Sequence, residues 1–342
     1  GEWLHLYNET HLKADRKERA AVGMFDSDEE LQEYSQTGQE RDSTFCEPLM
    51  VPLPFFNHRH HTHPLPMLSL AGASTTLYAA TRRLQDVSFG PKSDGTGVDK
   101  SGNSEVTTSP NLQMHLINER VVFLQPTRHA WASQVHRILY DYIQHRSYVI
   151  DTVHPDIELQ FQNAVKEYMF VFQSEALRRG KKYFVYQVPK VVDRVKDDGT
   201  TVKSVVLVPP LKTHHLRLSG NRLTDDLPAW WFHEYMFNEH HSATPKMTKS
   251  LYMNDGEVID WDKQDLCQLQ DKTQAIYCNS FSKAPEQMRP TGQLTWSAIP
   301  ELHGEWEVEH MDNAVMNMYI KSWNVGTISG GNWQMLFTAG AM

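Results

Sequence analysis

The sequence has little cysteine and no long apolar segment. Its three cysteines, Cys46, Cys267 and Cys278, are odd in number and too far apart for a Cys-x-x-Cys metal motif. This spacing argues against a disulfide scaffold or a zinc knuckle and favours reduced intracellular thiols. No run of about 18 apolar residues occurs, so the sequence offers no membrane-spanning helix.

The sequence also lacks the excess of positive charge that is typical of nucleic-acid-binding proteins. The formal net charge is -9 at pH 7, whereas contact with phosphates requires a basic face. Residues 1–4 do not begin a signal peptide, which would have a basic region followed by an apolar block. Without such a signal, the triplet Asn8-Glu9-Thr10 is a weak indication of glycosylation.

The patterns that are present indicate a folded β-protein. Hydrophobic residues make up 40% of the chain and aromatic residues 11%. Glutamates alternate with Trp306, Val308 and His310 over residues 305–310, which is the period of a strand with one wet face. Met316, Met318 and Ile320 recur on one face of a second strand. Residues 329–332 then form a tight turn before a closing apolar strand at 333–337.

Other segments extend this prediction along the chain. The unbroken apolar run 168–172 fits a buried strand, and Asp197–Thr200 between valine-rich runs predicts a hairpin over 190–201. Helices are expected within 1–24 and 130–142, and exposed loops at 26–47 and 90–110. Further strands are expected at 65–78, 119–124, 157–162, 216–218, 230–237, 275–281 and 293–296.

Two successive β-domains are the simplest interpretation of these elements. The length of 342 residues allows two domains of ordinary size. Pro209-Pro210 follows a valine-rich strand and is a plausible junction. The sequence therefore predicts an all-β chain with domains at 1–212 and 213–342.

His58-Arg59-His60-His61-Thr62-His63 is the sharpest metal candidate. Jelly-roll cupins use a His-x-His pair, a following Glu and a distant His to hold a transition metal. Here Pro64-Leu65-Pro66 takes the place of the Glu, so a polar loop is the preferred interpretation. A cupin-type metal-dependent enzyme using the His58–His63 cluster remains an alternative, which elemental analysis of histidine variants would test.

A second histidine group resembles a zinc-protease motif but does not complete it. His233-Glu234 would need a histidine at position 237 of a helix, and Phe237 stands there instead. The aromatic residues around it favour a strand packed on both sides. His240-His241 follows without the required spacing.

The remaining candidates have ordinary structural explanations. Ser329-Gly330-Gly331 lacks the lysine of a phosphate-binding loop and fits a hairpin turn. Asp225-Asp226 and the pair Asp260/Asp262 fit solvated turns. The tryptophans could line a sugar site, so a carbohydrate-binding β-sandwich is a second alternative, but core and subunit contacts are favoured. They are Trp230, Trp231, Trp296, Trp306, Trp323 and Trp333. No catalytic, cofactor-binding or metal-binding residue is predicted.

Short phrases over nearly the whole chain resemble the major capsid proteins of nucleocytoplasmic large DNA viruses, in the order of that family. Each phrase alone is weak, and their shared order makes the resemblance strong. In the first half they are Gly1–Glu9, Leu53–Asn57, Leu65–Met67, Glu119–Tyr148 and Leu159–Glu167. In the second half they are Leu216–Arg222, Asn238–His241 with Pro245, Ile276–Ser282, Pro285–Glu286, Arg289–Gly292, Trp323–Val325 and Ile328–Gly331.

The resemblance implies a tandem double jelly roll with a structural, non-enzymatic role. It implies a homotrimer that forms a pseudo-hexagonal capsomer and tiles an icosahedral shell over an internal viral membrane. Its partners would be neighbouring capsomers and minor capsid and penton proteins, without direct nucleic-acid binding. The expected location is the virion, after assembly in the cytoplasm of the host cell.

The resemblance has departures. The first strands of the family's first jelly roll would precede Gly1, and the phrase after Gly292 reads Gln293-Leu294-Thr295-Trp296. A jelly roll without its first strands would leave unpaired strand edges. The 342-residue chain alone is therefore expected to aggregate, and an N-terminally extended chain to trimerise, as light scattering would test.

Overall fold

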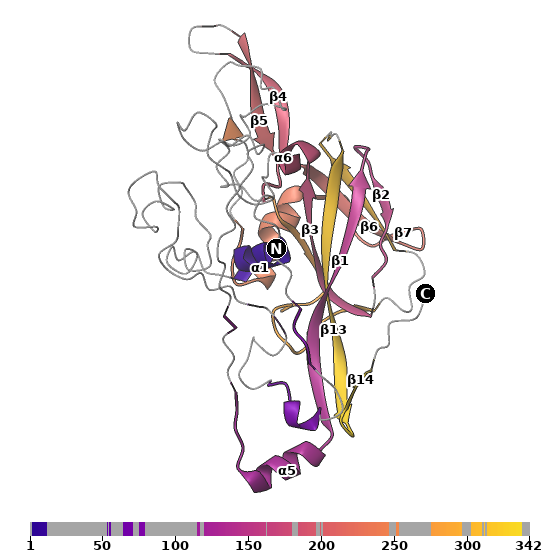
Figure 1. Ribbon diagram of the computed structural model, residues 1–342. Helices are drawn as coiled ribbons and strands as arrows, with labels where there is room; N and C mark the ends of the chain where they lie inside the picture. Colours follow the sequence, from indigo (N-terminus) through magenta and orange to yellow (C-terminus); the bar gives the residue numbers. More distant parts are fainter. Residues whose placement is uncertain are drawn as a thin grey trace, which may run out of the picture.

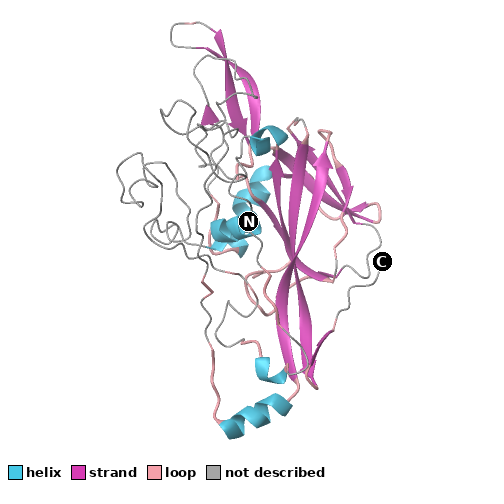
Figure 2. Ribbon diagram, in the orientation of Figure 1, coloured by secondary structure: helices cyan, strands magenta, loops and turns pink. Residues whose placement is uncertain are grey.

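In the computed structural model, two packed antiparallel sheets form the centre of the protein (Figure 1). The strands dominate, and the helices are short and lie outside the sheets (Figure 2). The residues that the structure describes are 2–11, 53, 55, 64–70, 75–78, 115–116, 120–161, 163–179, 184–195, 199, 201–245, 251–252, 275–295, 302–309, 311 and 313–336.

The first sheet contains the longest strands. Its order is β1 (His136–Ile150), β13 (Ala314–Ser329), β3 (Ala164–Gln173) and β10 (Tyr277–Ser280). The short β11 (Leu294–Thr295) pairs with β3, and β14 (Asn332–Met335) pairs with β13. All ten residues of β3 are buried, because the second sheet covers one of its faces and α1 and α7 cover part of the other.

The second sheet has the order β2 (Asp156–Glu158), β12 (Leu302–Val308), β6 (Leu211–Leu218) and β7 (Asn221–Arg222), with β8 (Leu227–Pro228) on β6. The chain passes repeatedly from one sheet to the other. The main path of each sheet has four strands, and two facing sheets of four strands are the arrangement of a jelly roll. A separate hairpin, β4 (Val188–Val195) and β5 (Thr201–Val208) with β9 (Leu251–Tyr252), projects from one end.

The described helices connect or cover these strands. They are α1 (Glu2–His11), the 3-10 helix η1 (Met67–Ser69), α5 (Gln125–Ser133), α6 (Glu175–Arg179), the π-helical turn η2 (Trp231–Tyr235) and α7 (Met236–His240). Within the described part of the chain, no helix has the length and apolar character needed to cross a membrane.

Strand pairing crosses the predicted domain boundary near residue 212. Strand β1 lies before that position and pairs with β13, which lies after it, from His136↔Ile328 to Ile150↔Ala314. Strand β3 pairs with β13 in the same way. The two-sheet sandwich therefore contains strands from both sides of residue 212. Local periodicity does not reveal pairing between segments this far apart in the sequence.

Several predicted elements are confirmed. Strand β12 alternates buried and half-buried residues, with its glutamates on the wetter face. The hairpin over 190–201 is β4–β5, and β3 and β10 lie where buried strands were expected. The tight turn at 329–332 joins β13 to β14, and its Gly330 and Gly331 adopt φ of 59° and 83°, values that favour glycine.

Other predicted elements are wrong. Residues 230–237 are helical rather than extended, because their buried side chains recur at helical spacing, at Phe232, His233, Met236 and Phe237. Residues 120–124 are not a strand, and 67–69 form a helical turn within the predicted strand pair at 65–78. The helix expected at 130–142 ends at Ser133, and β1 begins at His136. Residues 12–24 of the first expected helix lie outside the described residues.

Candidate functional site

A buried cluster of charged side chains lies on the outer face of the first sheet. Glu167 of β3 and Lys321 of β13 are register partners, and each side chain is 1% exposed. Lys321 Nζ lies 3.1 Å from Glu167 Oε1. Two buried charges at this distance stabilise each other only if their remaining polar atoms also find partners.

His241, which directly follows α7, extends the cluster outward. Its side chain is fully buried, and its Nε2 donates to Glu167 Oε2 at 2.8 Å. Its Nδ1 lies 3.3 Å from Glu286 Oε1 but outside hydrogen-bonding geometry. The backbone N–H and the hydroxyl of Ser242 both donate to the Glu286 carboxylate, which holds it in place.

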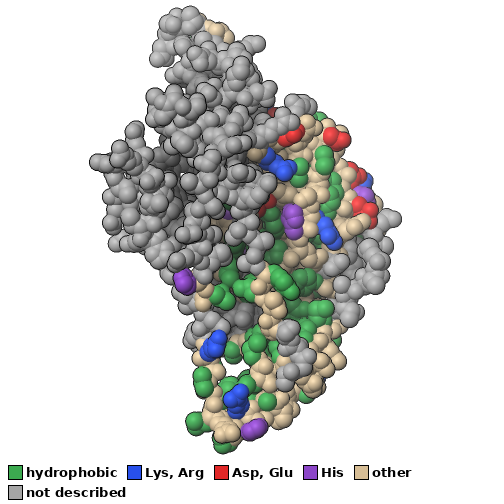
Figure 3. Space-filling view, viewed as in Figure 1, with side chains coloured by type: hydrophobic (Ala, Val, Ile, Leu, Met, Phe, Trp, Pro, Cys, Tyr) green, Lys and Arg blue, Asp and Glu red, His purple; other side chains and the backbone are tan. Residues whose placement is uncertain are grey.

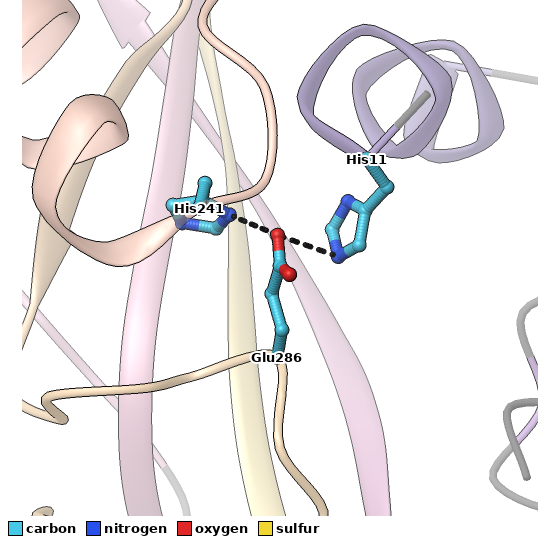
Figure 4. A group of neighbouring side chains, drawn as sticks. All are labelled: His11, His241 and Glu286. Atoms are coloured by element: carbon cyan, nitrogen blue, oxygen red, sulfur yellow. Dashed lines mark ion pairs between the residues drawn. The ribbon is translucent and has the colours of Figure 1, made fainter. Parts of the chain in front are cut away.

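Helix α1 contributes the outermost member, His11. Its Nε2 lies 3.6 Å from Glu286 Oε1, on the opposite side of that carboxylate from His241 (Figure 4). The His11 ring stacks on Tyr7 at 4.0 Å and meets the His241 ring edge-on at 5.8 Å. The cluster therefore joins α1 to the loop after β10 and, through His241, to the sheet.

The charges in the cluster alternate. Burial would raise the pKa of Glu167, but Lys321 and His241 outweigh it and hold that pKa well below its usual range. Burial would lower the pKa of His241, but Glu167 raises it well above its usual value. Contacts with His241 and Ser242 lower the pKa of Glu286 to about 2, against the effect of burial.

The outer histidine and the nearby cysteine are neutral. Burial and the charge of Lys321 lower the pKa of His11 to about 3. Burial raises the pKa of Cys278 to about 11, so its sulfur, 3.6 Å from both Glu167 Oε2 and His241 Nε2, is a protonated thiol. A protonated, buried thiol is a poor nucleophile.

Polar contacts also fix the first turn of α1 to the sheet. The hydroxyl of Tyr319 and the amide of Asn317 both donate to Glu2 Oε2, at 2.6 and 3.0 Å. Further along the helix, Asn8 is 6% exposed and Thr10 fully buried. These two residues belong to the glycosylation triplet, and their burial leaves no space for a glycan on Asn8.

The inner face of the same sheet carries a neutral hydrogen-bond chain. Asn279 Nδ2 donates to the Tyr168 hydroxyl at 2.9 Å, and that hydroxyl lies 2.8 Å from His214 Nε2. Nδ1 of His214 lies 2.9 Å from the carbonyl oxygen of Glu305. Because this carbonyl can only accept, Nδ1 carries the hydrogen and Nε2 accepts from Tyr168. The chain links the two sheets through the core.

An exposed apolar surface lies at the end of the molecule that contains α5 and β14, where hydrophobic side chains gather (Figure 3). Val135 precedes β1 and Met335 ends β14, and both strands flank the same end of β13. We call this surface the apolar end. Its members are Val121, Val122, Leu124, Val135, Met335 and Leu336, which are 47% to 89% exposed. Large exposed apolar surfaces mark interaction sites.

The structure separates the histidines considered in the sequence. His58–His63 lies outside the described residues. His233 is buried with its Nδ1 bonded to the carbonyl of Ile276 at 2.8 Å, whereas Glu234 is exposed. Phe237 fills the position of the missing ligand and is fully buried. The zinc-protease motif is absent from this segment even though it is helical.

The other candidates have structural roles. Asp226 lies 2.6 Å from His215 and 3.2 Å from Arg222, so it belongs to a surface network of charges. Asp260 and Asp262 lie outside the described residues, as does Trp296. Among the described tryptophans, Trp306 is a core residue stacked on His214, Trp333 packs against Gly326, and Trp230 is 52% exposed.

Sequence reasoning missed the charged cluster. Nothing in the local sequence marks its residues as buried, because the helix α1 that covers them lies far away in the chain. One signal was present in the sequence. Three residues that meet in the cluster are Glu167, His241 and Glu286. Each belongs to a phrase that carries the resemblance to capsid proteins.

Comparison with known proteins gives the fold. No family model and no curated protein sequence matches the chain. A quasi-atomic structure of the PBCV-1 virus capsid is 12% identical and matches with a TM-score of 0.53, over 94% of this chain and 78% of that chain.

Two further solved structures give weaker matches. PBCV-1 VP54, as fitted into a reconstruction of the virophage Sputnik, is 12% identical over 63% of this chain, with a TM-score of 0.42. The Faustovirus major capsid protein is 13% identical over 60% of this chain, also with a TM-score of 0.42. The chain spans 54% and 36% of these two proteins.

The match to the PBCV-1 capsid extends well beyond the sandwich of residues 136–335, which accounts for one jelly roll. It agrees with the fold that the resemblance in the sequence implies. The chain therefore has the double jelly-roll fold of viral capsid proteins.

Proposed function

We propose that this protein is a major capsid protein of a large double-stranded DNA virus. The observation that carries the proposal is the fold match over 94% of the chain to a virus capsid. The described sandwich supports it, since packed side chains fill the space between its two sheets. The role is structural rather than enzymatic.

In this proposal three copies form a pseudo-hexagonal capsomer, and capsomers tile an icosahedral shell. The apolar end supports such an assembly, because Val122 and Leu124 are 89% and 82% exposed and stable interfaces are apolar at their centre. Neighbouring capsomers, minor capsid proteins and penton proteins are the proposed partners, with an internal viral membrane beneath. The virion is the proposed location, after assembly in the host cytoplasm.

The oligomeric state tests the proposal. Mass photometry of the whole purified protein should give particles of three times the mass of one chain. Val122→Glu combined with Leu124→Glu should shift the population towards monomers, because charges at the apolar end oppose its burial. Val195→Glu, at a 66% exposed position on the projecting hairpin, is the control and should leave trimers intact. A wild-type protein that remains a monomer at all concentrations would contradict the proposal.

No described residue favours either alternative function. The cupin-type enzyme depends on His58–His63, outside the described residues, and the carbohydrate-binding sandwich depends on an exposed tryptophan surface. Trp306 is 2% exposed, and Trp231 is half-buried and stacked on Tyr235 at 4.2 Å. Among the described tryptophans, only Trp230 is more than half exposed.

A further inference from the structure

His11, His241 and Glu286 come from three separate parts of the chain and bring one ligand atom each into one small region. His11 ends α1, His241 follows α7, and Glu286 lies in the loop after β10 (Figure 4). One ligand atom from each of the three residues lies within 4.8 Å of the other two. Two imidazoles and one carboxylate are a ligand set that zinc accepts.

Two of the three spacings between these ligand atoms fit a tetrahedral ion. Zinc bonds of about 2.1 Å at tetrahedral angles place two ligand atoms about 3.4 Å apart. Glu286 Oε1 lies 3.3 Å from His241 Nδ1 and 3.6 Å from His11 Nε2. The side chains therefore need only small movements to bind an ion.

The hydrogen bonds around His11 leave its Nε2 as a bare acceptor. The Thr10 hydroxyl donates to the Leu6 carbonyl at 2.9 Å and so accepts from His11 Nδ1, which lies 2.7 Å away. The Tyr7 carbonyl, 3.1 Å from the same Nδ1, can also only accept. Nδ1 thus carries the hydrogen, and the lone pair of Nε2 faces a carboxylate oxygen. Two facing acceptors repel each other unless a cation lies between them.

Two buried nitrogens lack a hydrogen-bond partner at this point. They are His11 Nε2 and His241 Nδ1, the same atoms that the ligand geometry selects. Buried polar atoms without partners are uncommon and cost free energy, so each calls for an explanation. A bound cation would satisfy both atoms.

The surroundings hold the ligands as metal sites commonly do. His241 donates its other ring N–H to Glu167 at 2.8 Å, and a carboxylate in this position orients a metal-binding histidine. Ser242 holds Glu286 by its backbone N–H at 2.8 Å and by its hydroxyl. Lys321, whose charge also acts on His11, is paired with Glu167.

We propose that His11, His241 and Glu286 bind a zinc ion that fastens α1 to the jelly-roll sandwich, with water as the fourth ligand. The ion takes the place of the proton on His241 Nδ1, which leaves as the metal binds. The neighbouring group of Glu167, His241 Nε2 and Cys278 is less suitable, because Glu167 already contacts Lys321 and the thiol is protonated. The site does not depend on the capsid role.

Metal analysis of the whole chain tests the proposal. Protein stripped with a chelator, given Zn²⁺ and desalted should retain about one zinc per chain at the cluster. His11→Gln and Glu286→Gln should each weaken this binding by more than ~100-fold, since loss of even a ligand's hydrogen-bond partner typically costs 10–100-fold. Co²⁺ in place of zinc should give the visible absorption of a tetrahedral ion.

Two control variants separate this site from other histidines. His303→Gln changes a surface histidine that pairs with Asp156, and zinc binding should be unchanged. Replacing His58, His60, His61 and His63 together by Gln should also leave the cluster's zinc in place.

The inference is overturned if the wild type retains no zinc, or if the four-histidine variant loses all of it. It is also overturned if His11→Gln and Glu286→Gln bind as tightly as the wild type. In that case zinc binds elsewhere, and the ion pair between His241 and Glu286 holds this part of the structure without metal. Circular dichroism of the metal-free variants establishes that they are folded, and Glu286→Gln decides the matter if His11→Gln unfolds.

Discussion

The two faces of the β1–β13–β3–β10 sheet are both buried, yet they use opposite chemistry. On the inner face, Tyr168, Phe170 and Phe172 of β3 pack against the second sheet. On the outer face, Glu167 pairs with Lys321 beneath α1 and α7. Successive residues of one strand therefore serve an apolar core and a charged cluster.

The difference shows how a strand can be buried without being apolar on both faces. The inner face satisfies its polar groups with neutral hydrogen bonds from Asn279 through Tyr168 to His214. The outer face satisfies its groups by alternating charge, from Lys321 through Glu167 to His241. The stability contributed by the inner face should thus depend on close packing of its side chains, and that of the outer face on the balance of its charges.

The largest expected effect on stability comes from removing a packed side chain on the inner face. Phe170→Ala should lower the free energy of unfolding by about 3–5 kcal/mol, because it removes a fully buried ring and leaves a cavity. Urea unfolding followed by tryptophan fluorescence measures this. Phe184→Ala, at a 39% exposed position, is the control. Equal losses in the two variants would show that the ring of Phe170 is not a core element.

Removing one charge on the outer face should cost nearly as much. Lys321→Met leaves Glu167 without its lysine and should lower the free energy of unfolding by about 3 kcal/mol or more. The double variant Lys321→Met with Glu167→Gln should recover much of that loss, since no unbalanced charge then stays buried. The measurement is a double-mutant cycle in urea, and strictly additive losses would argue against the charge balance.

Much of the inner face could be predicted from the sequence, but the outer face could not. The run 168–172 and the alternation in β12 indicated buried and one-sided strands, because side chains alternate locally. The same alternation gives no sign that the charges of Glu167 and Lys321 are buried. Their burial depends on α1, which lies far away in the sequence, and on the pairing of β1 with β13 across the predicted boundary at 212. Local patterns contain neither piece of information.

Acid should affect the inner face through His214. Burial lowers the pKa of His214 to about 3, against about 6.5 in an unfolded chain. The unfolded state therefore binds the proton more tightly, so this contribution to stability is complete above pH 6.5 and is lost as pH falls towards 3. Between pH 7 and pH 4 the loss is about 3 kcal/mol at most.

His214→Gln tests this acid dependence, because glutamine keeps a donor and an acceptor but does not titrate. Its free energy of unfolding should fall less steeply between pH 7 and pH 4 than that of the wild type. His303→Gln, at the surface, should leave the wild-type slope in place. Parallel slopes for His214→Gln and the wild type would show that His214 does not become charged on unfolding.

The smallest effects concern two glycines beneath tryptophan rings. A Cβ on Gly304 would lie 2.1 Å from the Trp306 ring, and one on Gly326 would lie 2.1 Å from the Trp333 ring. Trp306 is buried and stacked on His214 at 4.5 Å, whereas Trp333 is only partly buried and has space to move. Gly304→Ala should cost about 1–3 kcal/mol and Gly326→Ala less, as thermal melting would measure. A larger loss of stability in Gly326→Ala than in Gly304→Ala would mean that side chains around Trp306 can move to make space for the added methyl group.

Negative-stain microscopy of the purified full-length protein tests the central claim most directly. A capsid protein of this fold should appear as triangular particles with a hexagonal base, each formed by three chains. Uniform single-chain particles at concentrations where the apolar end should associate would contradict the proposed function.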